Sequence, residues 1–292
     1  MYIVYRFFLI ILIVKMKKKI LIIGCLGYVG SYLSEKFSKS YQITGVDSKK
    51  KKSFFKNKFV CKKYQNLPKG FLKQFNYIFF FAGLSSVKES IKDDIKTVNE
   101  NTIDLWKLAE KCNNKTKLIY ASSASVHNQS KKTLSVNSYD ASKMASDILM
   151  KYSKIKTLGL QMATISGISY ATREELIFNA MCINSIKKKK IFLSNPESYR
   201  GLLFLEDLYK VISNVINNKI NFWNRSIQCC SCTFKIKEIA DIISKEFSSK
   251  IYRMKNSKTY SFKIHSIRKF GIKPATIKKQ CKIFKKNYNE KN

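Results

Sequence analysis

The chain has 292 residues, of which 45% are hydrophobic, which is enough for a full core and too many for a disordered protein. Its formal net charge is +37, but 50 of the 56 basic residues are lysines spread along the chain and only six are arginines. Proteins that read nucleic acids rely on arginine, so this pattern argues against nucleic-acid binding as the main role.

The first 16 residues precede the first predicted element. The apolar run at 7–14 is too short to span a bilayer, and no small-residue cleavage site follows it. We expect residues 1–16 to lie outside the fold, with Met16 as the true start and no membrane partner. The alternative is a helix lying on a membrane surface.

The predicted fold begins with a strand, a glycine-rich turn and a helix. An apolar segment at 19–23 leads into Gly24, Gly27 and Gly30, and an amphipathic segment follows. Glycines let the backbone approach a pyrophosphate at a helix amino terminus, where the helix dipole favours anions. The spacing is a variant of the dinucleotide-binding fingerprint. We expect the dinucleotide to contact Gly24, Gly27, Tyr28, Val29 and Gly30.

The second predicted strand, 42–46, is followed by Asp47, 23 residues after Gly24. A carboxylate at this place accepts hydrogen bonds from a ribose 2′-hydroxyl and repels a 2′-phosphate. That repulsion is on the order of 4 kcal/mol per charge pair at ~4 Å and an effective dielectric constant of about 20. The sequence therefore predicts NAD rather than NADP, with the lysines at 49–52 weakening the preference.

The next predicted elements alternate as a doubly wound sheet requires. The third predicted strand, 77–81, ends in Ala82 and Gly83, and the lysine-rich segment 49–74 before it carries no predicted strand. A helix is predicted over 97–112. Its predicted inward-facing residues are Val98, Leu105, Ala109 and Cys112.

A strand over 117–126 places Ser123 at the carboxyl edge of the predicted sheet, where open α/β folds bind ligands. A helix over 138–153 carries Tyr139 and Lys143 four residues apart, and therefore on one face. A lysine ammonium beside a phenol favours the ionised phenol, which otherwise titrates near ~10. The same helix has an apolar stripe that is either core or a subunit interface: Ala141, Met144, Ala145, Ile148, Leu149 and Tyr152.

The glycine turn, Asp47, Ser123 and the Tyr139–Lys143 pair, in this order, resemble the extended short-chain dehydrogenase/reductase family. Within it, the chain is most similar to the NAD-dependent epimerase/dehydratase group that acts on nucleotide sugars, over roughly residues 17–280. The resemblance implies an α/β fold, a Rossmann-type doubly wound parallel sheet with a smaller C-terminal substrate-binding lobe. It implies an NAD-binding domain at 17–165, joined by a strand-helix portion near 200–230, and a lobe formed mainly by 166–292.

The resemblance also implies roles for individual residues. Tyr139 would take the proton of a sugar hydroxyl, Ser123 would hydrogen-bond the same oxygen, and Lys143 would hold the nicotinamide ribose and lower the tyrosine pKa. Asn66–Leu67 stands where the family has an acidic–apolar pair that contacts adenine. The remaining implied cofactor residues are Ala82, Gly83 and Asn99, and the implied substrate residues are Ser85, Ser123, Arg173, Asn179 and Arg200. A guanidinium binds phosphate through two hydrogen bonds, which favours Arg200 for the diphosphate.

The implied reaction is epimerisation of a nucleotide-diphosphate sugar by removal and return of hydride, in surface polysaccharide synthesis. Ala124–Ser125 replace the Asp–Glu pair that a 4,6-dehydratase has after its hydroxyl residue, which argues against dehydration. A keto-sugar reductase or dehydratase of the same family, and a non-catalytic dinucleotide-sensing or RNA-binding relative, stay open. The resemblance further implies a cytoplasmic homodimer, and the eight cysteines and two histidines form no metal-binding pattern.

Overall fold

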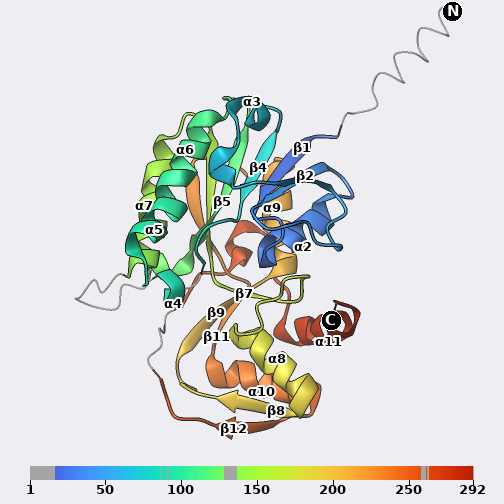
Figure 1. Ribbon diagram of the computed structural model, residues 1–292. Helices are drawn as coiled ribbons and strands as arrows, with labels where there is room; N and C mark the ends of the chain where they lie inside the picture. Colours follow the sequence, from blue (N-terminus) through green and yellow to red (C-terminus); the bar gives the residue numbers. More distant parts are fainter. Residues whose placement is uncertain are drawn as a thin grey trace, which may run out of the picture.

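The computed structural model describes residues 17–85, 87–90, 92–127, 137–257, 261 and 263–291. Its centre is a sheet of seven parallel strands in the order β10-β6-β5-β4-β1-β2-β3 (Figure 1). The Rossmann-type α/β fold predicted from the sequence is confirmed. The strands are β1 (Lys19–Ile23), β2 (Gln42–Asp47), β3 (Lys58–Cys61), β4 (Tyr77–Phe80), β5 (Lys117–Ser123), β6 (Lys156–Met162) and β10 (Arg225–Cys229).

Helices cover both faces of this sheet because its strands are apolar on both sides. Ile20 and Ile22 of β1 pack on the face covered by α2 (Tyr28–Phe37) and α9 (Leu205–Ile216). Leu21 and Ile23 pack on the opposite face, with α3 (Lys69–Leu72), α6 (Asp104–Lys111) and the β5 residues Leu118 and Tyr120.

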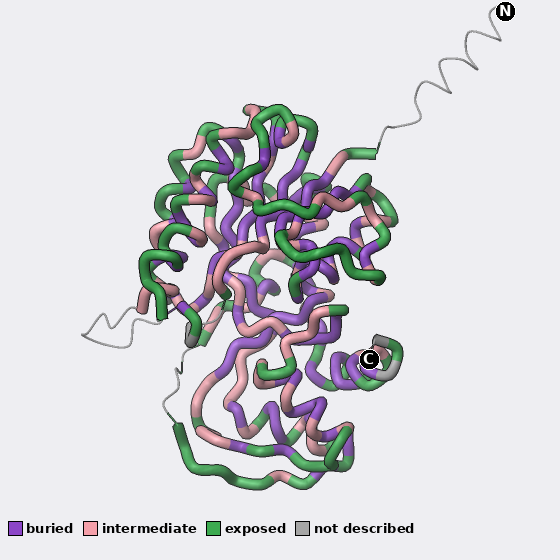
Figure 2. Tube along the Cα trace, in the orientation of Figure 1, coloured by how far each residue is buried: buried purple, intermediate pink, exposed green. Residues whose placement is uncertain are grey.

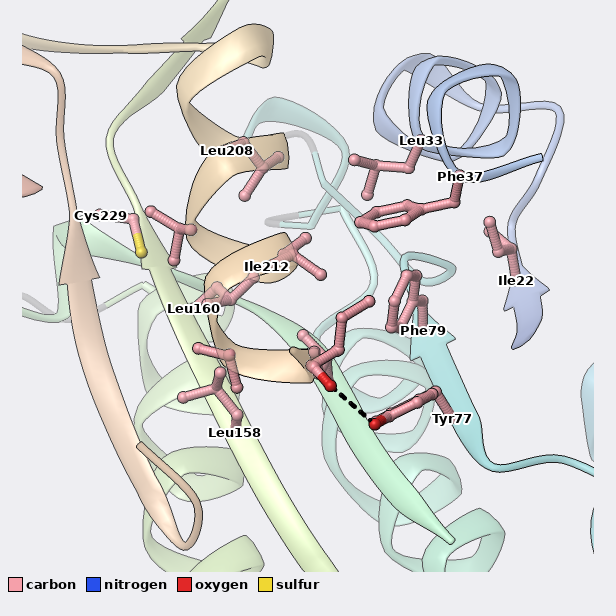
Figure 3. Packing of buried hydrophobic residues seen from close by; sticks show 14 of the residues in the cluster. Ile22, Leu33, Phe37, Tyr77, Phe79, Leu158, Leu160, Leu208, Ile212 and Cys229 are labelled. Carbon is pink, nitrogen blue, oxygen red and sulfur yellow. Dashed lines mark hydrogen bonds between the residues drawn. The ribbon is translucent and has the colours of Figure 1, made fainter. Parts of the chain in front are cut away.

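Figure 3 shows the packing on the α2 and α9 face. Phe37 of α2 meets Phe79 of β4 edge to face, with ring centroids 5.4 Å apart. The Tyr77 hydroxyl donates a hydrogen bond to the Ile216 carbonyl oxygen at 2.9 Å, which satisfies a carbonyl at the end of α9. Residues far apart in the chain are thereby fixed on one face of the sheet.

Among its described residues, the second lobe has two small sheets and three α-helices (Figure 1). Phe178, Phe204 and Phe284 pack together in its core, with ring contacts of 5.4 Å and 5.8 Å to Phe178. Figure 2 shows the buried segments concentrated inside each lobe. The elements are β7 (Thr164–Ser166), β9 (Tyr199–Phe204) and β11 (Cys232–Lys235), β8 (Lys190–Leu193) and β12 (Lys250–Arg253), and α8 (Ile177–Lys188), α10 (Ile236–Phe247) and α11 (Ile277–Lys291).

The chain returns to the central sheet after β9. Helix α9 packs on the sheet, and β10 pairs with β6 at its edge. Strands β6 and β7 are separated by a single residue, yet they belong to different sheets. The division of the chain into two domains at residue 165 stays a prediction.

Strand β3 was not predicted, because Phe59, Val60 and Cys61 form only a short apolar run between lysines. It pairs with β2 at the edge of the sheet, where its side chains are partly exposed, so charged neighbours are tolerated there. The predicted third strand is therefore the fourth, β4.

The helix predicted over 97–112 is three pieces. Helix α5 (Asp94–Val98) leads into a π-helical turn, η2 (Asn99–Ile103), and then into α6. A π turn has more residues than an α turn, so side chains beyond it face other directions than a regular helix predicts. The prediction that Val98 faces inward is wrong, since 38% of it is exposed, whereas Leu105 and Ala109 are buried.

Helix α7 (Ser138–Leu149) has a polar inner side. Its buried residues are Ser142, Lys143, Ser146 and Asp147. The apolar stripe faces outward, with Ile148 53% exposed and Tyr152, just past the helix, 77% exposed. The alternative that this stripe is core of the protomer is therefore wrong.

Candidate functional site

A cavity of about 780 Å³ lies at the carboxyl ends of β1, β2, β4 and β5. Strand order reverses between β1 and β4, and ligands of open α/β sheets bind at such a point. Its volume is in the range of small-molecule sites, roughly 300–1,000 Å³. Predicted site residues that line it are Gly24, Gly27, Tyr28, Val29, Asp47, Ala82, Gly83, Ser85, Ser123, Tyr139 and Arg173.

The glycine turn has the shape that a bound dinucleotide needs. Gly24 has φ +82°, and a Cβ there would lie 2.8 Å from the Ala82 nitrogen. A Cβ on Gly30 would lie 2.1 Å from the Gly24 carbonyl oxygen. The absence of side chains lets the turn close tightly, so that α2 begins at the cavity with its amino terminus toward it.

Asp47 is held at one end of the cavity. The Leu26 N–H donates to its Oδ2 and the Lys49 N–H to its Oδ1, both at 3.1 Å. The carboxylate is thus fixed beside the glycine turn, where it can meet a ribose. Lys49, Lys62 and Lys63 line the same cavity and partly offset its charge.

Tyr139 and Lys143 lie together as their spacing predicts. Tyr139 is in the first turn of α7, and the Lys143 Nζ is 5.7 Å from the centroid of its ring. Lys143 is buried behind the cavity lining and donates a hydrogen bond to the Ala121 carbonyl oxygen at 3.1 Å. Burial lowers the pKa of Lys143 to about 8, and the Asp147 carboxylate opposes this shift. At neutral pH Lys143 is therefore still a cation beside Tyr139.

Asp147 anchors a buried polar cluster that the sequence did not reveal. Its carboxylate accepts hydrogen bonds from the Tyr120 hydroxyl at 3.0 Å, the Ser122 hydroxyl at 2.8 Å and the Gln161 amide at 2.7 Å. These donors come from β5 and β6, so the cluster fastens α7 to the sheet directly behind Lys143. The polar inner side of α7 follows from these partners.

Ser123 belongs to a chain of hydroxyl groups. Its Oγ is 2.7 Å from the Ser125 Oγ, and the Ser125 hydroxyl donates to Oδ1 of Asp140. Asn137 donates from Nδ2 to the other Asp140 oxygen at 2.9 Å. Ser123, Ser125 and Tyr139 all line the cavity.

Two predicted substrate residues meet in the cavity, and one predicted substrate residue does not. The Arg173 Nη1 lies 3.3 Å from the Ser85 Oγ, and both residues line the cavity. Asn179 is fully buried, and its amide donates to the Tyr28 hydroxyl oxygen and to the Arg173 carbonyl oxygen while accepting from the Gly167 N–H. These internal bonds hold the Asn179 amide in place, and its assignment to substrate stays a prediction.

Arg200 lies at a second, smaller cavity of about 260 Å³. Neighbouring residues line the two cavities: Arg173 and Leu176 line the large one, while Glu175 and Ile177 line the small one. Phe192 also lines the small cavity, from the lobe's two-stranded sheet.

Two predicted cofactor contacts lie elsewhere than expected. Asn99 is exposed, and the asparagine beside the Ala82–Gly83 turn is Asn101, which is buried and donates to the Leu84 carbonyl oxygen and to the Ser142 hydroxyl. Leu67 is buried in the core and Asn66 is exposed, whereas Tyr64 and Gln65 line the cavity.

Across the part of the chain that the structure describes, no group of three or more His, Cys, Asp or Glu side chains could hold a metal ion. No helix in those same residues is long and apolar enough to cross a bilayer. Burial, with a smaller contribution from Asp47, raises the pKa of the Cys25 thiol to about 12, so this cysteine in the glycine turn is unreactive.

Solved structures share this fold over nearly the whole chain. A UDP-glucose 4-epimerase from Thermotoga maritima is 14% identical, with a TM-score of 0.77, over 93% of this chain and 99% of its own. A UDP-N-acetylglucosamine 4-epimerase from Methanobrevibacter ruminantium is 18% identical, with a TM-score of 0.77, over 94% and 99%. An NAD-dependent NDP-hexosamine 5,6-dehydratase of tunicamycin biosynthesis is 15% identical, with a TM-score of 0.78, over 94% and 99%.

At such identities the structural likeness shows the fold alone, and a comparison with curated proteins gives no match. The sequence itself matches the model of the NAD dependent epimerase/dehydratase family over residues 20–226. That match spans more than half of the chain, from the first strand to the start of β10. The chain therefore belongs to the NAD-dependent epimerase/dehydratase family.

Proposed function

We propose that this protein is an NAD-dependent epimerase that acts on a sugar attached to a nucleoside diphosphate. The observation that carries the proposal is the convergence of Ser123 and Tyr139 on the cavity that begins at the glycine turn. Lys143 lies behind them, close enough to influence the charge of Tyr139.

The chain's own residues fit NAD. The glycine turn offers backbone N–H groups to a pyrophosphate, and Asp47 offers a carboxylate to the adenosine ribose. Ala82 and Gly83 line the path from there toward Ser123 and Tyr139. NAD would supply the hydride acceptor and donor for the sugar.

Tyr139 is the acid–base group in this proposal. It removes the proton of the reacting hydroxyl and returns it later, while the Lys143 cation favours its ionised form. Ser123 contacts the same oxygen and fixes its position. Because the pKa of Lys143 is about 8, the Lys143 side chain keeps its positive charge at neutral pH.

The substrate would extend from this centre toward Arg173 and Arg200. Arg173 and Ser85 line the large cavity near the sugar, and Arg200 at the smaller cavity would hold the diphosphate. A sugar tethered by its diphosphate can turn and present its other side to the cofactor, as epimerisation requires. Relatives of this fold have been solved with UDP-glucose and with UDP-glucuronic acid and NAD.

Three further parts of the proposal follow from this function. A nucleotide-sugar epimerase fits surface polysaccharide synthesis, and the proposed cofactor and substrate fit a cytoplasmic enzyme. The exposed apolar residues of α5 and α7 fit a homodimer.

A keto-sugar reductase is the second candidate, because Ser123, Tyr139 and Lys143 would also serve one-way hydride transfer. Ala124–Ser125 stand in place of an Asp–Glu pair, which disfavours dehydration.

The test is to incubate the protein with NAD and a panel of UDP-glucose, UDP-N-acetylglucosamine and UDP-glucuronic acid, and to follow products by NMR. An epimerase converts a substrate without net consumption of reduced cofactor, whereas a reductase consumes it. Tyr139→Phe should lower turnover about 10²–10⁴-fold. Tyr41→Phe, which removes a surface hydroxyl bonded to Asn217, serves as the matched control. Equal turnover of wild type and Tyr139→Phe would exclude the proposal.

A further inference from the structure

In the hydrogen-bonded series Ser123–Ser125–Asp140, the donor and the acceptor of each bond can be assigned, and the assignment begins with Asn137. The Asp140 N–H donates to the Asn137 Oδ1 at 2.9 Å, capping the amino terminus of α7. That bond fixes the Asn137 amide, so its Nδ2 is the atom that faces the Asp140 Oδ2, at 2.9 Å. An ionised carboxylate only accepts hydrogen bonds, and Asp140 accepts one on each oxygen: from Asn137 on Oδ2 and from Ser125 on Oδ1.

The positions of the Ser123 and Ser125 hydroxyl protons are then determined. Ser125 has a single hydroxyl proton, which it gives to Asp140, so in the 2.7 Å contact with Ser123 it must accept. The Ser123 proton consequently points at Ser125. The Ser123 Oγ also accepts from the Ser125 N–H at 3.3 Å, which leaves one lone pair for a ligand in the cavity.

This direction matters for any substrate hydroxyl that meets Ser123. With its own proton committed to Ser125, Ser123 can only accept a hydrogen bond from the ligand. The substrate hydroxyl therefore donates to Ser123, Ser123 donates to Ser125, and Ser125 donates to the Asp140 carboxylate. A series of hydrogen bonds that all point toward a carboxylate can carry a proton away from the substrate.

We propose that Asp140, acting through Ser125 and Ser123, is a second proton acceptor for the reacting hydroxyl, parallel to Tyr139. The inference rests on the proposed function, because it needs a hydroxyl that is oxidised at this site. Asp140 and Ser125 are then positioning and relay residues, while Ser123 is the group that touches the substrate.

The step balances without another reactant. The substrate O–H bond breaks and its proton joins the Ser123 Oγ, while the Ser123 proton moves to Ser125 and the Ser125 proton moves to Asp140. The electron pair of the O–H bond forms the carbonyl as the neighbouring C–H bond gives its hydride to NAD. Return of the hydride reverses each proton movement, so Asp140 ends ionised as it began.

The test compares single and double variants in the half-reaction that reduces bound NAD, followed by the absorbance of reduced nicotinamide with the substrate found in the panel. If the two routes are parallel, Tyr139→Phe retains a residual rate that depends on the relay. Adding Asp140→Asn or Ser125→Ala to Tyr139→Phe should lower this residual rate by a further factor of about 10². Asparagine keeps the shape of Asp140 but cannot take up the proton.

Matched variants separate the relay from a structural role. Ser125→Thr keeps the hydroxyl and should keep the residual rate of the Tyr139→Phe protein. Asp241→Asn, on the exposed side of α10, should leave it unchanged. Binding of NAD, measured by protein fluorescence, and the thermal midpoint should stay near those of Tyr139→Phe alone. If Asp140→Asn impairs folding, Ser125→Ala decides, because it leaves the Asn137–Asp140 cap in place.

A second readout does not depend on the rate. Infrared difference spectra of the Tyr139→Phe protein with NAD and substrate should show a protonated carboxylic acid band as the keto sugar forms, and adding Asp140→Asn should remove it. Double variants as active as Tyr139→Phe, a Tyr139→Phe protein with no residual reduction, or a missing carboxylic acid band would each overturn the relay. Absence of NAD reduction in the wild type with every nucleotide sugar would instead reject the proposed function itself, and the relay with it.

Discussion

Lys143 and Asp147 lie one helical turn apart on the buried side of α7, and the carboxylate opposes the loss of charge that burial imposes on the ammonium. Burial is the larger influence, since the pKa of Lys143 falls from its usual 10.5 to about 8. The charge that Tyr139 experiences therefore depends on a residue that does not line the cavity.

Asp147→Asn should move the alkaline limit of activity to lower pH. Asp147 raises the pKa of Lys143, so its removal lowers that pKa below about 8, and Lys143 loses its proton earlier as pH rises. The pH profile of turnover measures this shift. Glu246→Gln, which removes a surface carboxylate paired with Lys278, should leave the profile unchanged. A profile identical to the wild type would show that Asp147 does not influence the site.

Gly30→Ala should destabilise the protein by about 1–3 kcal/mol and abolish NAD binding. The added Cβ would lie 2.1 Å from the Gly24 carbonyl oxygen, and backbone cannot give way as a flexible side chain can. Gly70→Ala in α3 is the control, since a Cβ there meets nothing within 4 Å. Chemical denaturation and NAD titration of both variants would check this. A Gly30→Ala protein that binds NAD normally would contradict the expected role of the turn.

Asp47→Asn should reduce the preference for NAD over NADP by at least roughly tenfold, because it removes the repulsion of a 2′-phosphate. Lys49, Lys62 and Lys63 at the same end of the cavity should then favour NADP. The ratio of the two dissociation constants, measured at low and high salt, gives the result. An unchanged ratio would mean that Asp47 does not face the ribose.

Ile148→Lys should convert a dimer into a monomer. Ile148, Leu149 and Tyr152 are exposed at the end of α7, and Ile95 and Val98 are exposed on α5, which packs against α7. Sedimentation analysis of the wild type and the variant measures the effect. Met254→Lys, at another exposed apolar residue, should not change the mass. A monomeric wild type would instead leave this apolar surface without the expected partner.

Local patterns were enough to predict the framework of the site. The apolar run before Gly24, the spacing of the glycines and the four-residue separation of Tyr139 and Lys143 depend on neighbours in the chain. Each of these predictions fixes geometry over a few residues. The structure accordingly has β1, the glycine turn and α7 where they were expected.

Residues whose surroundings come from distant segments were not predicted correctly. The hydrogen bonds of the Asn179 amide with Tyr28 and Gly167 join distant segments, and local patterns do not show them. Asn101 rather than Asn99 lies beside the Ala82–Gly83 turn, and its contacts with Leu84 and Gly83 depend on how separate segments pack. The role of Asp140 depends on Ser125 and Asn137, and a single sequence does not show that the three meet.

The two sides of the 12-residue helix α7 are open to different kinds of evolutionary change. On its inner side, Lys143 and Asp147 are useful for their protons and charges, so a replacement of equal size but different chemistry is harmful there. On its outer side, Ile148 and Leu149 contribute only apolar surface and shape. Other apolar residues could therefore replace them if the surface that they contact changed as well. Homologous proteins should therefore vary in sequence along one edge of this helix and keep the identities along the other.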